Sequence, residues 1–260
     1  MENRDDCPCY LYFDIANASL LDASSEVYAT ALTYPEQETW EVAGTTVGEL
    51  ASRAFGFTLR HSGSWNGYAV TGHGRSMLLS QTKWVVPEGS DFDPLYRFAF
   101  ETEGFEEEKV HPVEFIKEHA RVLVRFTNAD RLFGDGEGFP FEVIVRSNTR
   151  GIDALSGAPV TGAFEHRPGP EEGNAFRFIL PRQADRSLVM ELRAKDGLPV
   201  EGLTEVVGLW DILSGKGGID WTEKNLPDVT VEIEYGTADV TVEVTDWNGD
   251  TTLPQPETIK

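Results

Sequence analysis

Strict alternation of apolar and polar residues marks two runs near the C-terminus, and this pattern constrains the fold more than any other feature of the chain. Successive side chains of a β-strand point to opposite faces of a sheet, so each run predicts a strand with one buried and one solvated face. Gly236 to Asp239 separate the runs and predict a turn, so the whole segment predicts a hairpin. The apolar positions are Val229, Val231, Ile233 and Tyr235 in the first run, and Val240, Val242 and Val244 in the second.

Comparable alternation recurs along the rest of the chain. The runs are Leu11, Phe13 and Ile15; Phe55, Phe57 and Leu59; Ala120, Val122, Val124 and Phe126; Phe139, Phe141, Val143 and Val145; Phe176, Phe178 and Leu180; and Leu188, Met190 and Leu192. No pattern indicates a long amphipathic helix, and the two short helices that we expect lie within residues 45–53 and 207–213. The sequence therefore predicts an all-β protein with short strands, as in β-sandwiches.

The length of the chain predicts two domains. A sandwich has about 100 residues, whereas this chain has 260. An acidic segment that contains glycine, Glu101 to Lys109, interrupts the strand patterns and is followed by Val110, His111 and Pro112. We therefore predict an N-terminal β-sandwich domain over residues 1–110 and a C-terminal β-sandwich domain over residues 111–260.

The charge of the chain excludes one class of partner. Lys and Arg number 22 against 44 Asp and Glu, which gives a formal net charge of −22. Such a surface repels the phosphates of nucleic acids and of anionic lipids, so we expect no nucleic-acid partner. Solubility is the simplest reason for the acidity, and a calcium-rich or cationic partner is the alternative. No run reaches the roughly 18 to 20 apolar residues of a membrane helix, and Met1 to Asp6 resemble no signal peptide, so we expect that an export signal has been removed.

Motifs for catalysis and cofactor binding are incomplete wherever they begin to form. Gly215 and Lys216 suggest a phosphate loop, but Trp210 and Gly217 stand where that loop needs glycine and serine or threonine. The five histidines lack the spacing of a helical zinc pair, and the acidic clusters at 135–137 and 246–250 indicate turns rather than calcium loops. The sequence predicts no catalytic residue, no cofactor and no metal, and hence a protein that is not an enzyme.

Cys7 and Cys9 are the only cysteines of the chain. Their spacing places both side chains on the same face of an extended segment, where a disulfide across so short a loop would be strained. A bridge, a pair of thiols and partial oxidation all remain open. Two cysteines alone make a poor zinc site, because zinc usually takes four ligands.

Three segments resemble one protein family. Asn3 to Cys9, followed by an aromatic strand, resemble the opening of its members, and Pro112 to Val122 are similar to the start of their second domain. The strongest match is the end of the chain, with Trp210-Asp211-Ile212, Ile219-Asp220-Trp221, Leu226-Pro227-Asp228-Val229 and Val244-Thr245-Asp246-Trp247. The family is that of the FimB-type or Mfa-like fimbrial anchor and minor-subunit lipoproteins of the Bacteroidales, also called type V pilus subunits.

This resemblance implies two transthyretin-like Greek-key β-sandwich domains in tandem. It also implies a non-catalytic structural subunit of a fimbria, either the outer-membrane anchor or an accessory subunit. A lipid on a cysteine upstream of Glu2 would hold the protein to the outer membrane, at the cell surface. Other fimbrial subunits are the expected partners, joined when an extended segment of one protein completes a sheet of another.

Two terminal strands are the candidate assembly elements. Either strand could exchange between subunits, or both could be ordinary core strands with a polar tail, Thr251 to Lys260, after the second. The residues concerned are Tyr10, Leu11, Tyr12, Phe13, Asp14 and Ile15 in the N-terminal strand, and Val240, Val242, Val244, Asp246 and Trp247 in the C-terminal strand.

The alternative function is that of a surface lipoprotein that binds glycans or acts as an adhesin, with a glycan or a host protein as partner. Its candidate residues are the aromatics Trp40, Trp65, Tyr68 and Trp84, because aromatic faces stack on sugars. The same residue types also fill the cores of sandwiches. A third hypothesis, a glycosidase with two carboxylates, has no motif to support it.

Overall fold

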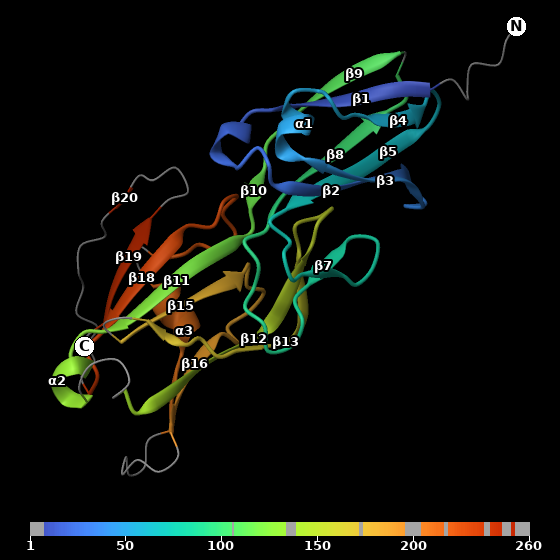
Figure 1. Cartoon of the computed structure of the whole chain (residues 1–260). Coiled ribbons are helices and arrows are strands. Elements are labelled where there is room, and N and C mark those ends of the chain that lie inside the picture. Colours follow the sequence, from blue (N-terminus) through green and yellow to red (C-terminus); the bar gives the residue numbers. More distant parts are fainter. Residues whose placement is uncertain are drawn as a thin grey trace, which may run out of the picture.

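The fold is all-β and consists of two sandwiches, one above the other in Figure 1. The computed structural model describes residues 8–105, 107–133, 139–171, 174–195, 204–215, 218–236, 240–245 and 251–252. The strands within these residues form four sheets, two in each sandwich. The prediction of an all-β sandwich protein is confirmed, and the transthyretin-like connectivity stays a prediction.

The first sandwich is built mainly from the N-terminal part of the chain. Its elements are β1 (Pro8–Ile15), the 3-10 helix η1 (Ala18–Leu20), β2 (Glu26–Tyr34), β3 (Thr39–Thr46), α1 (Val47–Ala51), β4 (Phe57–Arg60), β5 (Ser64–Thr71), β8 (Tyr96–Glu103), β9 (Glu108–Val113) and β10 (Ile116–Lys117). One sheet has the order β4-β1-β9 and the other β10-β8-β5-β2-β3. Their facing sides meet in a core where Leu11 and Phe13 of one sheet pack against Ala29, Phe98 and Phe100 of the other.

The second sandwich takes up the rest of the described chain. Its elements are β6 (Met77–Leu78), β7 (Lys83–Val85), β11 (His119–Phe126), α2 (Ala129–Phe133), β12 (Phe141–Asp153), β13 (Pro159–His166), β14 (Pro170–Glu171), β15 (Ala175–Pro181), β16 (Val189–Ala194), β17 (Thr204–Val207), α3 (Leu209–Leu213), β18 (Asp228–Ile233), β19 (Val240–Thr245) and β20 (Thr251–Thr252). The sheet orders are β14-β15-β11-β18-β19-β20 and β17-β16-β12-β7-β6, with β13 also paired to β12. Val122 and Phe178 of the first of these sheets share a core with Val143 and Met190 of the second.

The predicted C-terminal hairpin is present. β18 and β19 pair antiparallel, with Val229 opposite Val244 and Val231 opposite Val242. Val231 is fully buried and Val244 is 6% exposed, so the apolar face of the hairpin packs into the core as the alternation predicts. Residues 237–239 of its turn lie outside the described residues.

Both predicted short helices are confirmed. Helix α1 begins after Thr46, whose hydroxyl accepts a hydrogen bond from the backbone N–H of Glu49 while the Glu49 carboxylate accepts one from the backbone N–H of Thr46. This capping box satisfies two backbone groups that the first turn leaves without partners. Helix α3 carries two fully buried leucines, Leu209 and Leu213, into the second core.

Strand pairing runs across the predicted domain boundary near residue 110. β7, which precedes that point, pairs with β12 of the second sandwich, and β10, which follows it, pairs with β8 of the first. The acidic segment 101–109 contains the end of β8 and the start of β9. The division into residues 1–110 and 111–260 therefore stays a prediction. Each sandwich contains strands from both sides of residue 110.

Some predictions concern residues that the structure does not describe. Cys7, the acidic turns at 135–137 and 246–250, and the tail from residue 253 lie outside the described residues. Cys9 is described: it is buried, and its Sγ donates a hydrogen bond to the Phe105 carbonyl at 3.1 Å. In the described part of the chain no helix is long and apolar enough to cross a membrane.

Candidate assembly strands and the junction between the sandwiches

The N-terminal candidate strand, β1, is the middle strand of its sheet. It pairs antiparallel with β4 and parallel with β9. Leu11, Phe13 and Ile15 point into the first core, and the Phe13 ring lies 5.0 Å from that of Phe98 and 5.1 Å from that of Phe100. Because both edges of β1 are hydrogen-bonded and one face is buried, the strand occupies a slot in the sheet.

The other face of β1 carries the remaining candidate residues. Tyr10 is 46% exposed and Asp14 is exposed, whereas Tyr12 is half-buried. The rings of Tyr10 and Tyr12 stack with their centroids 6.5 Å apart. These side chains face away from the core, so the alternate buried residues Cys9, Leu11, Phe13 and Ile15 fix the register of β1.

Asn17 fixes the end of the slot. Its side-chain amide donates to the Phe115 carbonyl at 2.8 Å and accepts from the Phe115 N–H at 2.9 Å. The amide thus supplies the two hydrogen bonds that a further strand residue would make. This contact connects the end of β1 to the segment that leads into the second sandwich.

The C-terminal candidate strand, β19, is held differently. It pairs with β18 along its whole length, but with β20 only at Val244 and Thr245. Within the described residues, no strand pairs with the outer edge of residues 240–243. Val240 and Val242 are half-buried, and Asp246 and Trp247 lie outside the described residues. The two candidate strands belong to different sandwiches and are not brought together (Figure 1).

Three consecutive ionisable residues, Lys117, Glu118 and His119, are buried where the chain passes from one sandwich to the other. We call them the junction cluster. Lys117 Nζ donates to the Leu226 carbonyl and to Asp228 Oδ1, both at 2.7 Å. Burial lowers the pKa of the Lys117 ammonium, and the Asp228 carboxylate opposes that shift. The cation is tolerated inside the protein because an anion and a carbonyl dipole face it.

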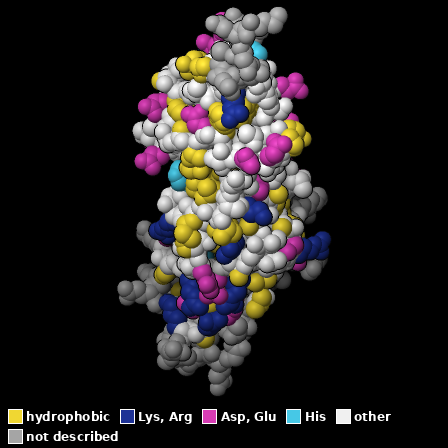
Figure 2. All heavy atoms as spheres, turned by 90° about the vertical axis from the view of Figure 1, so that its right-hand side faces the viewer, with side chains coloured by type: hydrophobic (Ala, Val, Ile, Leu, Met, Phe, Trp, Pro, Cys, Tyr) yellow, Lys and Arg dark blue, Asp and Glu magenta, His cyan; other side chains and the backbone are white. Residues whose placement is uncertain are grey.

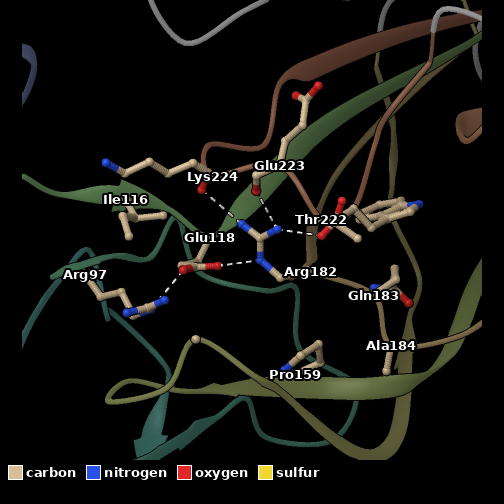
Figure 3. A pocket seen from close by; sticks show the side chains of 12 residues that line it. Arg97, Ile116, Glu118, Pro159, Arg182, Gln183, Ala184, Thr222, Glu223 and Lys224 are labelled. Atoms are coloured by element: carbon tan, nitrogen blue, oxygen red, sulfur yellow. Dashed lines mark hydrogen bonds and ion pairs between the residues drawn. The ribbon is translucent and has the colours of Figure 1, made fainter. Parts of the chain in front are cut away.

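Glu118 lies between two guanidinium groups from different sandwiches (Figure 3). Arg97 Nε of β8 lies 2.8 Å from Oε1, and Arg182 Nε, just after β15, lies 2.7 Å from Oε2. Arg182 also donates to the backbone carbonyls of Trp221 and Glu223 at 2.5 and 2.7 Å. A single buried carboxylate therefore bridges the two sandwiches.

A cavity of about 480 Å³ opens beside this carboxylate, lined by Ile116 and Trp221 among others. Gly157, in the turn before β13, lies against the Arg97 guanidinium with a φ of +77°. A Cβ at this position would collide with the guanidinium and would also strain the backbone. Glycine here allows the loop of the second sandwich to approach Arg97.

His119 completes the junction cluster. Its ring is fully buried, Nδ1 lies 3.1 Å from the Leu95 carbonyl, and the Tyr96 ring meets it edge-on at 5.0 Å. Burial holds the pKa of the imidazole well below its ordinary value, and the neighbouring Lys117 lowers it further. The histidine is therefore neutral at pH 7, and Nδ1 carries the hydrogen because it faces a carbonyl.

The aromatics proposed for glycan stacking are mostly core residues, which corrects that interpretation. Trp65 is 2%, Tyr68 is 0% and Trp84 is 4% exposed. Burial raises the pKa of the Tyr68 hydroxyl, which donates to the Gln81 carbonyl at 2.6 Å. Trp40 alone is half-buried, with the Arg60 guanidinium 4.1 Å above its ring. Trp65 and Tyr68 point to opposite faces of β5, and both are buried because the first core covers one face of that strand and the second core covers the other.

The sequence did not predict the junction cluster. A Lys-Glu-His run normally indicates an exposed segment, and only its position between two predicted strands could have drawn attention to it. Its partners Arg97, Arg182 and Asp228 lie far away in the sequence, so no local pattern reports the pairing. Among the described side chains, no group of three or more His, Cys, Asp and Glu could hold a metal ion.

Comparison with known proteins gives matches of structure only. No protein-family model matches the chain, and no curated protein matches it. The fimbrial anchor protein Mfa2 from Porphyromonas gingivalis matches with a TM-score of 0.61 and 11% identity, over 94% of this chain and 98% of its own. A candidate adhesin from Bacteroides thetaiotaomicron matches with a TM-score of 0.63 and 13% identity, over 94% of this chain and 98% of its own.

A candidate polysaccharide-binding protein, also from Bacteroides thetaiotaomicron, matches with a TM-score of 0.63 and 12% identity, over 98% of this chain and all of its own. The chain has the fold of these proteins. At 11 to 13% identity this likeness concerns the fold alone. The all-β sandwich fold that the family resemblance predicted is confirmed, and its transthyretin-like connectivity stays a prediction.

Proposed function

We propose that this protein is a non-catalytic structural subunit of a bacterial fimbria, either its outer-membrane anchor or an accessory subunit. One observation carries the proposal: the likeness to the fimbrial anchor Mfa2 extends over 94% of this chain and 98% of that one. A likeness of this extent includes both sandwiches and the junction between them. It favours a role that needs the whole architecture rather than a single domain shared by chance.

β1 supports assembly by strand complementation. The strand has one buried face and two hydrogen-bonded edges, which an incoming strand of the same pattern could reproduce. An incoming strand would need apolar residues at the positions of Leu11, Phe13 and Ile15, each of which stabilises the sandwich by about 1.5 to 3 kcal/mol when buried. Backbone hydrogen bonds to β4 and β9 would supply the rest of the binding energy.

β19 supports a second, weaker contact. The outer edge of residues 240–243 offers N–H and C=O groups for an added strand, because β20 covers only the end of β19. The net charge of −22 would disfavour random pairing of such edges between copies of the chain. We therefore propose β1 as the main assembly element and β19 as the accessory one.

The proposed location is the cell surface, with the protein held to the outer membrane by a lipid on a cysteine upstream of Glu2. The family resemblance of the N-terminal segment and the structural likeness to an anchor support this proposal. The other fimbrial subunits would be its partners.

Deleting the gene in the source bacterium tests the proposed function. For an anchor, electron microscopy should show fimbriae released into the medium, and for an accessory subunit, fimbriae of altered length or composition on the cells. Expression of the wild-type chain should restore the normal appearance. Fimbriae unchanged in number, length and attachment after the deletion would contradict both roles.

A surface adhesin that binds glycans is the second candidate function. The likeness to a candidate polysaccharide-binding protein favours it, and Trp40, half-buried beneath the Arg60 guanidinium, is the one of the four aromatics that a sugar ring could reach. A glycan array should then show binding that Trp40→Ala abolishes and Trp210→Ala, on α3 of the other sandwich, leaves intact. An array without any binding would exclude this function for the glycans tested.

A further inference from the structure

The β6–β7 hairpin, residues 75–83, exposes three consecutive apolar side chains. Met77 is 55%, Leu78 is 37% and Leu79 is 57% exposed. Single exposed apolar residues are common on protein surfaces, but a contiguous exposed group indicates an interaction site. These three lie at the outer edge of the β17-β16-β12-β7-β6 sheet, where β6 is the last strand.

Hydrogen bonds at the base of the hairpin hold these side chains away from the core. The Tyr68 hydroxyl donates to the Gln81 carbonyl at 2.6 Å, and the Thr82 hydroxyl donates to Asp153 Oδ2 at 2.8 Å. The Ala154 N–H donates to the Thr82 carbonyl at 2.7 Å. Because the base is fixed to both sandwiches, the exposed apolar group is a built feature of the fold.

The charge of the hairpin itself is opposite to that of the whole chain, although the carboxylates of Asp93 and Asp153 accept hydrogen bonds at its base. Residues 50–87 contain no aspartate or glutamate, although the chain has 44 of them in 260 residues. The only charged residues of the hairpin are Arg75 and Lys83, which flank the apolar group and are both exposed. The hairpin is therefore a cationic and apolar projection from an acidic protein.

The hairpin projects from the right-hand side of the molecule in Figure 1, near the label of β7. Figure 2 shows that side, where hydrophobic side chains gather at mid-height with Lys and Arg close by. β1 also begins at the right-hand end of the upper sandwich (Figure 1). The start of β1 and the hairpin can thus face the same flat surface.

We propose that the β6–β7 hairpin docks onto an anionic lipid surface. Met77, Leu78 and Leu79 enter the headgroup region, and Arg75 and Lys83 contact the anionic headgroups. Apolar side chains beside Lys or Arg have the composition of segments that bind membrane interfaces. The acidic remainder of the protein opposes this contact only weakly, because physiological salt screens charges beyond about 8 Å.

Two features favour a lipid surface over a protein partner. β6 has two residues, too few to template an added strand. Three side chains also fall well short of the roughly 1,200 to 2,000 Å² that a stable protein interface buries. Binding to a membrane needs neither a long strand edge nor a large buried area, because a few inserted side chains bind weakly and reinforce another attachment. The inference goes beyond the proposed fimbrial role and does not depend on it.

Sedimentation of the full chain with lipid vesicles tests the inference. Vesicles of phosphatidylglycerol and phosphatidylcholine provide the anionic surface, and phosphatidylcholine alone the neutral one. We expect the wild type to bind the anionic vesicles at low salt and less at high salt. Met77→Ser with Leu79→Ser should lower the partition coefficient about tenfold or more, because insertion of each apolar group contributes to binding.

A matched control removes two equally exposed leucines elsewhere. Leu20 and Leu132 are each 48% exposed, and the double variant Leu20→Ser with Leu132→Ser should bind like the wild type. Arg75→Gln with Lys83→Gln should lower binding to anionic vesicles about tenfold and remove most of its salt dependence. The same change at the exposed Arg186 and Lys195 should leave binding within about twofold.

Equal binding by the hairpin variants and their controls would overturn the inference, as would no binding of the wild type to anionic vesicles. If the wild type does not bind vesicles and a hairpin variant alters association with a protein, the hairpin is a surface for that protein instead. Circular dichroism of each variant must match the wild type. Because the vesicles contain no fimbrial subunit, this result is independent of the gene-deletion test.

Discussion

The two candidate assembly strands differ in how the fold holds them. β1 lies between two strands and places Leu11 and Phe13 in the first core with no exposure, whereas β19 has a full partner on one side and only two paired residues on the other. A strand whose loss opens a core must be replaced by a similar strand, while an edge can accept a strand without losing anything. Under the proposed function, this difference favours exchange for β1 and addition of a strand for β19.

Deletion of residues 1–15 should have the largest effect. It removes the buried side chain of Cys9 and those of Leu11, Phe13 and Ile15, of which the last three are worth about 5 to 9 kcal/mol together, comparable with the whole stability of a domain. We expect limited proteolysis to digest the first sandwich rapidly. The second sandwich, which has its own core, should resist digestion.

A synthetic peptide with the sequence of residues 8–15 provides the control for this deletion. If the slot of β1 can be refilled from outside, the peptide should restore resistance to protease, and a peptide with aspartate in place of Phe13 should not. A deleted chain as resistant as the intact one would show that β1 does not hold the first sandwich together.

Truncation of one apolar side chain in each strand compares them directly. Phe13→Ala should lower the free energy of unfolding by about 3 to 5 kcal/mol, because it leaves a cavity between Phe98 and Phe100. Val242→Ala, at a half-buried position, should lower it by about 1 kcal/mol. Urea denaturation followed by tryptophan fluorescence measures both. Equal losses of unfolding free energy in the two variants would contradict the distinction between β1 as a central strand and β19 as an edge strand.

Acid should destabilise the junction between the sandwich that contains β1 and the sandwich that contains β19. Because the pKa of the folded His119 imidazole is depressed, its contribution to stability is complete above the unfolded pKa of about 6.5 and is lost as the pH falls below it. Between pH 7.5 and 5.5 this loss is at most about 1.4 kcal/mol. Asparagine can keep the hydrogen bond to Leu95 without titrating, so His119→Asn should flatten the dependence of stability on pH.

The same measurement on His61→Asn, a half-buried histidine of the first sandwich, is the control for loss of an imidazole. Urea denaturation at each pH supplies the free energies. A wild type and a His119→Asn variant with parallel pH profiles would exclude the buried imidazole as the source of the acid sensitivity.

Deletion of residues 246–260 should have the smallest effect on stability. It removes β20, which pairs with only two residues of β19, and we expect a loss below about 1 kcal/mol. In the fimbriated bacterium, however, the deletion should change fimbrial length or attachment if the tail takes part in assembly. Normal fimbriae would exclude the tail and leave β1 as the candidate.

The sequence predicted the strands far better than their neighbours. Alternation located β1, β11, β15 and the β18–β19 hairpin, because the period of two is a local property of any strand with one buried face. The pairing of β1 with β9, and of β11 with β18, is parallel and joins segments about 100 residues apart. No local pattern encodes such pairs.

The candidate site was predicted in part. Alternation placed Leu11, Phe13 and Ile15 in the core, but it could not distinguish a central strand from an edge. The aromatic residues proposed to face a glycan were mostly buried, because their place in a strand, and not their chemistry, decides which way they point. The junction cluster was missed since its three charged residues become tolerable only through distant partners.

By itself the sequence determined that this chain is acidic and all-β, with an alternation of apolar and polar residues that locates many of its strands. Only the tertiary structure decided that β1 fills a slot while β19 borders an edge, that Glu118 bridges two sandwiches, and that Met77 to Leu79 project outward. The reason is physical: which face of a strand is apolar depends on residues next to each other, but which strand lies beside it, and which charge meets which, depends on segments that only folding brings together.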